Sequence, residues 1–262
     1  MSIVRLRAIV HRHWIVLRRA PHRWFEISFW PIMDVLLWGS LGAFVAQENE
    51  ASRAGAPYLL AGMVMFWTFT QAQFAIALGV NEETWTRNIL NVLTTPVREI
   101  EYIVGIAVFG LLKLLACLAT LTVTTIIFFG FDLSEIGWGV IPIMVLLVIN
   151  GWALAMVTVG MVLRFGQSAE ILIWGFNYAL MAFSGVFFPS DALPEGLRDV
   201  ASILPTTKAF SALRALLDGR PLPWGTLAAS LVGSIIAFVL AVGFAAWLLR
   251  MFRRRGFVTR YS

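Results

Sequence analysis

The stretch GWGVIPIMVLLVINGWALAMVTVGMVL, Gly137–Leu163, decides the fold class of this chain. It carries no charged side chain along its whole length. A helix needs about 20 apolar residues to cross the hydrocarbon core of a bilayer, and only helices and closed barrels satisfy their backbone hydrogen bonds there. Because the apolar residues are continuous rather than alternating with polar ones, the stretch predicts a membrane-spanning helix.

Similar apolar runs occur on both sides of this stretch. The chain is 59% hydrophobic and 13% charged, with a mean hydropathy of +0.81, which is far from the composition of a soluble globular domain. We therefore expect an all-α polytopic membrane protein with six transmembrane helices. The predicted spans are Ile27–Ala46, Tyr58–Val80, Tyr102–Phe131, Gly137–Leu163, Ile171–Phe188 and Trp224–Leu249. Cys117, the single cysteine, excludes an intrachain disulfide.

The remaining segments complete a single transmembrane domain over residues 1–262. In residues 1–23, apolar residues recur at helical spacing between arginines, which predicts a basic amphipathic helix in the membrane interface; a simple stop signal for insertion is the alternative. Residues 27–188 hold spans one to five. Prolines divide residues 189–223, where apolar residues at helical spacing predict an external hairpin of two short helices re-entering the outer leaflet, with a surface loop as the alternative. Residues 224–249 form span six, and 250–262 a basic tail.

The distribution of arginine predicts the orientation. With an even number of spans, both termini share a side with Arg87, Arg98 and Arg164, whereas the opposite side has fewer basic residues and several acids. The positive-inside rule then places both termini and residues 81–101 in the cytoplasm of a cell membrane, either an inner or a plasma membrane. The basic charge is thus an orientation signal and a contact for lipid headgroups, not a nucleic-acid site.

Residues 81–101, NEETWTRNILNVLTTPVREIE, are the most polar connection between spans on the cytoplasmic side. Asn81 is a suitable N-cap, and Glu82 and Glu83 suit the positive end of a helix dipole. Trp85 begins an apolar face at helical spacing, and Pro96 ends the pattern. The segment predicts a short amphipathic helix, with an ordinary interfacial loop helix as the simpler interpretation.

Two charged residues lie within the predicted spans. Asp34 lies in the cytoplasmic half of the first span, and Lys113 lies in the third. Charges at membrane depth are expected to be paired or functional. We expect a buried structural pair or interfacial contacts rather than a role in substrate binding.

Three segments of the sequence resemble those of a known protein family. The chain resembles the membrane subunit of type-2 ATP-binding-cassette (ABC) exporters in three places: the run from Glu82 and Thr84 to Val97, the segment SGVFFPSDALP at Ser184–Pro194, and Pro205 followed by Arg214. Together with six spans and an amphipathic N-terminus, the resemblance covers essentially the whole chain.

The resemblance implies a transporter subunit that exports an amphiphilic, lipid-linked or glycan substrate. It implies two copies of a cytosolic ABC ATPase as partners, a second permease copy in a homodimer, and a helix at 81–96 on which the ATPase docks. The implied coupling residues are Asn81, Glu82, Glu83, Thr84, Trp85, Arg87, Asn88, Leu90, Thr95 and Pro96.

Catalysis is expected to lie outside this chain. The phosphate-binding loop of ATPases requires glycine before its lysine, but Leu112 and Thr207 precede Lys113 and Lys208, the two lysines present. ATP and magnesium are therefore expected on the partner subunit, and we expect no cofactor or metal here. His11, His13 and His22 all precede the first span, and the first two point in different directions on a helix, so they do not predict a metal site.

Aromatic residues are the remaining clue to the cargo. The resemblance places a substrate path along spans one, two and five, and its candidate lining residues are Phe66, Trp67, Gln71, Phe74, Trp174, Asn177 and Phe183. Interface belts of aromatic residues explain others. Two alternatives stay open: a membrane-embedded enzyme and a passive channel, each of which would act without an ATPase.

Overall fold

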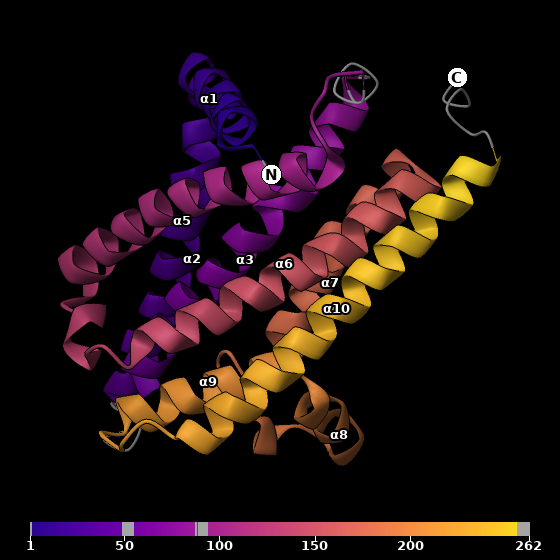
Figure 1. Ribbon diagram of the computed structural model, residues 1–262. Helices are drawn as coiled ribbons and strands as arrows, with labels where there is room; N and C mark the ends of the chain where they lie inside the picture. The colour runs from indigo at the N-terminus through magenta and orange to yellow at the C-terminus, as the bar shows by residue number, and fades with distance from the viewer. Residues whose placement is uncertain (1, 49–54, 87, 89–93, 256–262) are drawn as a thin grey trace.

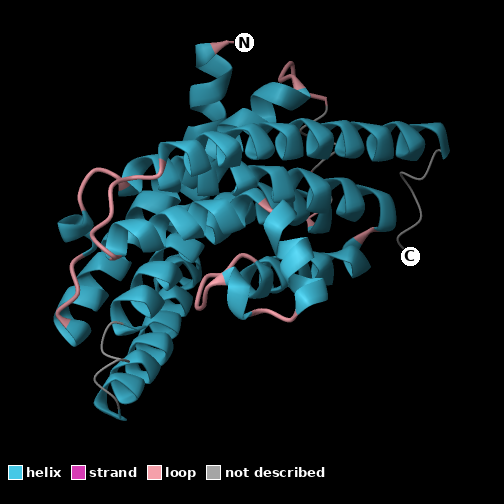
Figure 2. Ribbon diagram, turned by 90° about the horizontal axis from the view of Figure 1, so that it is seen from below, coloured by secondary structure: helices cyan, strands magenta, loops and turns pink. Residues whose placement is uncertain are grey.

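The computed structural model describes residues 2–48, 55–86, 88 and 94–255. All regular elements among these residues are helices, as the colouring of Figure 2 shows. The α-helices are α1 (Ile3–Arg19), α2 (Pro21–Glu48), α3 (Gly55–Trp85), α5 (Glu99–Phe129), α6 (Val140–Phe165), α7 (Ile171–Phe183), α8 (Glu195–Ile203), α9 (Pro205–Leu217) and α10 (Trp224–Arg255). Short 3-10 helices are η2 (Leu133–Ile136), η3 (Gln167–Glu170) and η4 (Ser190–Ala192).

In the described part of the chain, five helices are long and apolar enough to cross a membrane. Their spans are Pro21–Gln47, Pro57–Glu83, Ile100–Phe129, Val140–Phe165 and Trp224–Leu248. These confirm five of the six predicted spans in position, with shifts of several residues at their ends. The chain is therefore a multi-pass membrane protein.

The predicted fifth span is not confirmed. Its helix, α7, has 13 residues and ends at Phe183, not Phe188, and this is short of the roughly 20 residues that a span requires. Gly185 follows with a φ of +70°, a backbone conformation that a helix does not contain. Even so, α7 carries the chain from beside α1 and α2 to α9: Glu170, just before it, shares a cavity with His22, and Ser184, just after it, hydrogen-bonds Thr206 on α9 over 2.6 Å.

The bundle has two distinct ends (Figure 1). The N-terminal helix α1 and the C-terminal end of α10 lie at one end, and α8 and α9 lie at the other. We call these the α1 end and the α9 end. Which side of the membrane each end faces stays a prediction.

Helix α3 is the centre of the bundle. It packs against α2, α5 and α6. Of the residues in its apolar stretch, 83% are buried within the protein, compared with 22% in the apolar stretches of α2 and α10. At Gly151 on α6 a Cβ atom would lie 2.5 Å from the carbonyl oxygen of Phe69 on α3. Glycine at this position therefore lets the two backbones touch, as small residues do in membrane bundles.

The predicted external segment does form two helices, α8 and α9. In α9, Leu204 is the N-cap residue and Pro205 occupies the first turn. Phe210 and Leu213 of α9 are buried against the bundle, whereas Val200 and Ile203 of α8 are exposed. Whether these helices re-enter the membrane stays a prediction.

Candidate functional site

The predicted helix at 81–96 begins differently in the structure. Asn81 to Trp85 are the last residues of α3, so Asn81 does not cap a new helix. Asn81 is only 2% exposed, and Thr86 and Asn88 form turns directly after α3. The expected cap was wrong because α3 remains helical beyond its apolar run, where tertiary contacts hold its polar end. Leu90 and Arg87 lie outside the described residues.

The N-terminal helix α1 provides those contacts through ion pairs. Arg12 of α1 donates to the carboxylate of Glu83 over 2.5 Å. The Glu83 side chain is only 8% exposed, and its other oxygen accepts a hydrogen bond from Asn88 Nδ2 at 2.6 Å. A buried carboxylate needs such donors, because losing water without replacement is costly.

Two further ion pairs hold the same region. Arg23, at the start of α2, pairs with Glu82 at the end of α3, with Nη1 and Oε2 2.9 Å apart. Arg5 of α1 pairs over 3.2 Å with Glu101 in the first turn of α5. Glu101 also accepts from the backbone N–H groups of Ser2 at 2.8 Å and Arg98 at 3.0 Å. We call these three pairs (Arg5–Glu101, Arg12–Glu83 and Arg23–Glu82) the ionic frame.

The ionic frame brackets the predicted coupling segment. Glu82 and Glu83 lie at the start of residues 81–96 and Glu101 lies just after them, so α1 is tied to both ends of the segment and the α2 start to its first end. Apolar contact supports the same arrangement: a Cβ atom on Gly105 of α5 would lie 2.6 Å from Cγ2 of Ile9 on α1. A displacement of the segment must therefore move α1, α3 and α5 together or break these contacts.

His13 of α1 lies inside this junction. Its ring stacks on Phe109 with centroids 5.5 Å apart and lies near Tyr102. Burial, with help from the neighbouring Arg12 charge, lowers the pKa of His13 to about 4. His13 is therefore neutral at physiological pH. His11 and His22 are exposed, and within the described residues no cluster of potential metal ligands is found.

A cavity of about 430 Å³ opens at the α1 end, between α1, α2, α3, α5 and the η3–α7 region. Its apolar wall includes Trp67, Phe74 and Trp174, of which the last two meet edge to face with centroids 4.6 Å apart. Its polar lining includes Gln71, Asn81 and Lys113. We call it the inner cavity.

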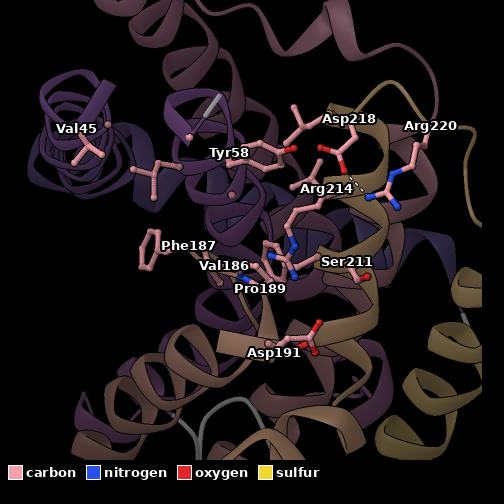
Figure 3. Close-up of a pocket in the computed structure, with 18 residues that line it drawn as sticks. Val45, Tyr58, Val186, Phe187, Pro189, Asp191, Ser211, Arg214, Asp218 and Arg220 are labelled. Carbon is pink, nitrogen blue, oxygen red and sulfur yellow. Dashed lines mark hydrogen bonds and ion pairs between the residues drawn. The ribbon is translucent and has the colours of Figure 1, made fainter. Parts of the chain in front are cut away.

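A second cavity, of about 550 Å³, lies at the α9 end between α2, α3, the 186–191 loop and α9. Figure 3 shows Arg214 reaching from α9 toward Val186 and Pro189. The Arg214 guanidinium donates to the carbonyl oxygens of Gly185 and, at 3.4 Å, Phe188, so it holds this loop onto α9. Burial lowers the pKa of Arg214. We call this the outer cavity.

Comparison with known proteins decides the family. A model described as ABC-2 type transporter matches residues 4–217. The chain belongs to the ABC-2 type transporter family. No curated protein gives a significant match to it. Family membership makes this chain the membrane permease of an ABC transporter, and it implies an ABC ATPase as partner.

The permease structure brings together four of the seven residues predicted to line a substrate path. Trp67, Gln71, Phe74 and Trp174 all line the inner cavity. Phe66 is instead buried beside Phe69, with ring centroids 5.7 Å apart. Asn177 is buried in a hydrogen-bond network with Thr70 and, at 2.6 Å, Gln73.

The other predicted residues have separate positions. Phe183 ends α7, where its carbonyl accepts a hydrogen bond from Thr207 at 3.4 Å. Thr95 and Pro96 lie in a bend before α5, and Thr95 Oγ1 accepts from Val97 N at 3.4 Å. Thr84 lies in the last turn of α3. A coupling role for these residues stays a prediction.

The two intramembrane charges of the permease do not meet as expected. Asp34 Oδ2 accepts a hydrogen bond from Trp67 Nε1 at 3.1 Å, whereas Lys113 lines the inner cavity. Among the described residues, no ion pair joins Asp34 to Lys113. An indole donor therefore partly compensates the Asp34 carboxylate.

Sequence reasoning missed the ionic frame. The signal was present, since α1 is rich in arginine and has no acid, while three glutamates lie within or just after the predicted coupling segment. Opposite charges at separate positions in the chain do not show which of them meet, however, so the individual pairs required the structure.

Proposed function

We propose that this permease is the membrane subunit of an ATP-driven exporter, moving an amphiphilic, lipid-linked or glycan substrate out across the membrane. In this proposal a separate ABC ATPase docks on residues 81–96. Two permease copies and two ATPase copies form the working complex, in a cell membrane with both termini in the cytoplasm.

The ionic frame is the observation that best supports the proposal. Surface ion pairs contribute little to stability, but Glu83 and Glu101 are almost fully buried, with side chains 8% and 2% exposed. Removing one partner of a buried pair is costly, so these pairs resist separation. A push on the coupling segment is then passed to α1, α3 and α5 as one unit.

Helix α3 connects the ionic frame to the inner cavity, so a push on its end can reach the cavity wall. Its last turn carries Glu82 and Glu83, and residues farther along the same helix, including Trp67 and Phe74, form the wall of the inner cavity. Movement of α3 at its polar end must therefore change the shape of the inner cavity. ATP hydrolysis on the partner would in this way alter a compartment of ligand size.

Reconstitution with the ATPase tests the proposal. The permease alone in proteoliposomes should neither hydrolyse ATP nor carry substrate, and the permease with its ATPase should do both. Binding of the ATPase should also protect residues 81–101, and not the α9 end around Trp138, from aqueous cysteine reagents in single-cysteine variants. ATP hydrolysis by the purified permease, or protection at Trp138→Cys alone, would refute the proposal.

A further inference from the structure

We infer that the inner cavity is a binding site for an amphiphile whose head group is uncharged and donates hydrogen bonds, such as a hydroxyl-rich or amide head. The volume, about 430 Å³, falls within the range of about 300–1,000 Å³ for small-molecule sites. That the occupant is the exported cargo rests on the function proposed above; that the cavity binds such a molecule does not.

Two buried polar atoms without partners carry the inference. Asn81 is 2% exposed, and its Oδ1 has no hydrogen-bond partner among the described residues. The same holds for Nε2 of His13, and both side chains line the inner cavity. Buried polar groups are nearly always satisfied, because leaving one without a partner is unfavourable. Both residues therefore line the same cavity and each keeps a polar atom with unused hydrogen-bonding capacity.

The positions of these two residues are fixed by the surrounding helices rather than by a ligand. On α3, Asn81 directly precedes Glu82 and Glu83. These two carboxylates are held by Arg23 and Arg12, respectively. The His13 ring is held by its stack on Phe109. The site is therefore formed in advance, and a ligand would not have to order it.

The balance of charge selects the head group. The cationic lining residues Arg23 and Lys113 are matched by two carboxylates, Glu82 and Glu170, and Arg23 is already engaged by Glu82. A phosphate or quaternary ammonium group would upset this balance. An uncharged head that donates to Asn81 Oδ1 would not.

The aromatic lining of the inner cavity suits an apolar chain. Trp67, Phe74 and Trp174 face the same cavity, and Trp174 and Trp30 are 39% and 56% exposed on helices at the bundle surface. Aromatic side chains of this kind offer large apolar contact area. A ligand with a polar head at Asn81 and a tail along these residues would match the lining at both ends.

Photolabelling tests the inference without the ATPase. The permease in nanodiscs is labelled with a diazirine-bearing alkyl glucoside, and competition is measured with dodecyl maltoside, dodecyl phosphate and dodecyltrimethylammonium. We expect saturable labelling on α3 and α7 around the inner cavity, displaced at least fivefold better by the maltoside than by either charged competitor. Better displacement by a charged competitor, or labelling confined to the outer cavity, would overturn the inference.

Variants identify the head-group contacts. Asn81→Leu and His13→Phe should each reduce labelling at least fivefold, while Tyr58→Phe in the outer cavity should leave it unchanged. Because leucine at a buried site risks disturbing the fold, His13→Phe provides the second test, since it keeps an aromatic ring on Phe109. Unchanged labelling in His13→Phe would refute the assignment. Saturable labelling without ATP-driven export would refute the exporter function but leave the binding site supported. ATP-driven export without labelling would refute the binding site but leave the exporter function supported.

Discussion

Removing either partner of the Arg12–Glu83 pair should have very unequal effects. The Arg12 side chain is 42% exposed and that of Glu83 8%. Arg12→Gln leaves a buried carboxylate with the Asn88 amide as its remaining side-chain donor among the contacts described. Loss of one partner from a fully buried pair costs about 3–5 kcal/mol. Because Arg12 is partly solvated and Asn88 remains, we expect about 2 kcal/mol.

Glu83→Gln should cost less. The glutamine oxygen still accepts a hydrogen bond, and Arg12 can reach water, so the loss should resemble that of an exposed pair, below about 1 kcal/mol. The double variant should be less destabilised than the sum of the two single changes, with a coupling energy of about 1 kcal/mol. The assay is unfolding in mixed micelles by titration with dodecyl sulfate, comparing midpoints at constant slope. Equal costs, the reverse order, or strict additivity would show that Glu83 does not depend on Arg12.

Two other changes probe the packing of the same bundle. Burial lowers the pKa of His13 from 6.5 to about 4. Between these pH values His13 binds a proton in the unfolded chain but not in the native protein. The free energy of unfolding therefore falls as the pH drops from 6.5 toward 4, by up to about 3 kcal/mol. His13→Gln should flatten this loss in melting temperatures measured at pH 7.5 and 5, and an unchanged pH profile would contradict it. Gly151→Ala should destabilise the permease by about 1–3 kcal/mol, because its Cβ would lie 2.5 Å from the Phe69 carbonyl oxygen. Gly175→Ala, where a Cβ would meet nothing within 4 Å, is the matched control and should be neutral or stabilising; equal melting temperatures for the two variants would refute the close-packing argument.

The spans could be predicted from sequence because membrane burial acts on each helix separately. Hydropathy alone located α6 and α10, which were predicted as Gly137–Leu163 and Trp224–Leu249, and prolines marked α8 and α9. The fifth span was overestimated for a related reason. Val186, Phe187 and Phe188 are apolar enough to prolong a hydropathy run, but they follow the backbone break at Gly185 and form part of a loop beside α9.

The functional region was harder to predict, because its structure depends on contacts between distant residues. Asn81, Glu82 and Glu83 have the sequence of a helix start, yet they end α3, held there by α1 and α2. No local sequence pattern predicts that Arg12 pairs with Glu83 or that Arg23 pairs with Glu82. The inner cavity is a property of five elements together, so its lining residues could be proposed in part from aromatic content but not delimited.

The most direct test of the central claim, that a separate ATPase drives this permease through residues 81–96, is the amount of substrate exported per ATP hydrolysed. The measurement compares proteoliposomes containing the ATPase with the parent permease, the double variant Trp85→Ala/Leu90→Ala, and the control Trp138→Ala, whose indole is 86% exposed at the α9 end. We predict that the double variant hydrolyses ATP but exports at least tenfold less substrate per ATP, while the control matches the parent. An unchanged ratio in the double variant would contradict the account.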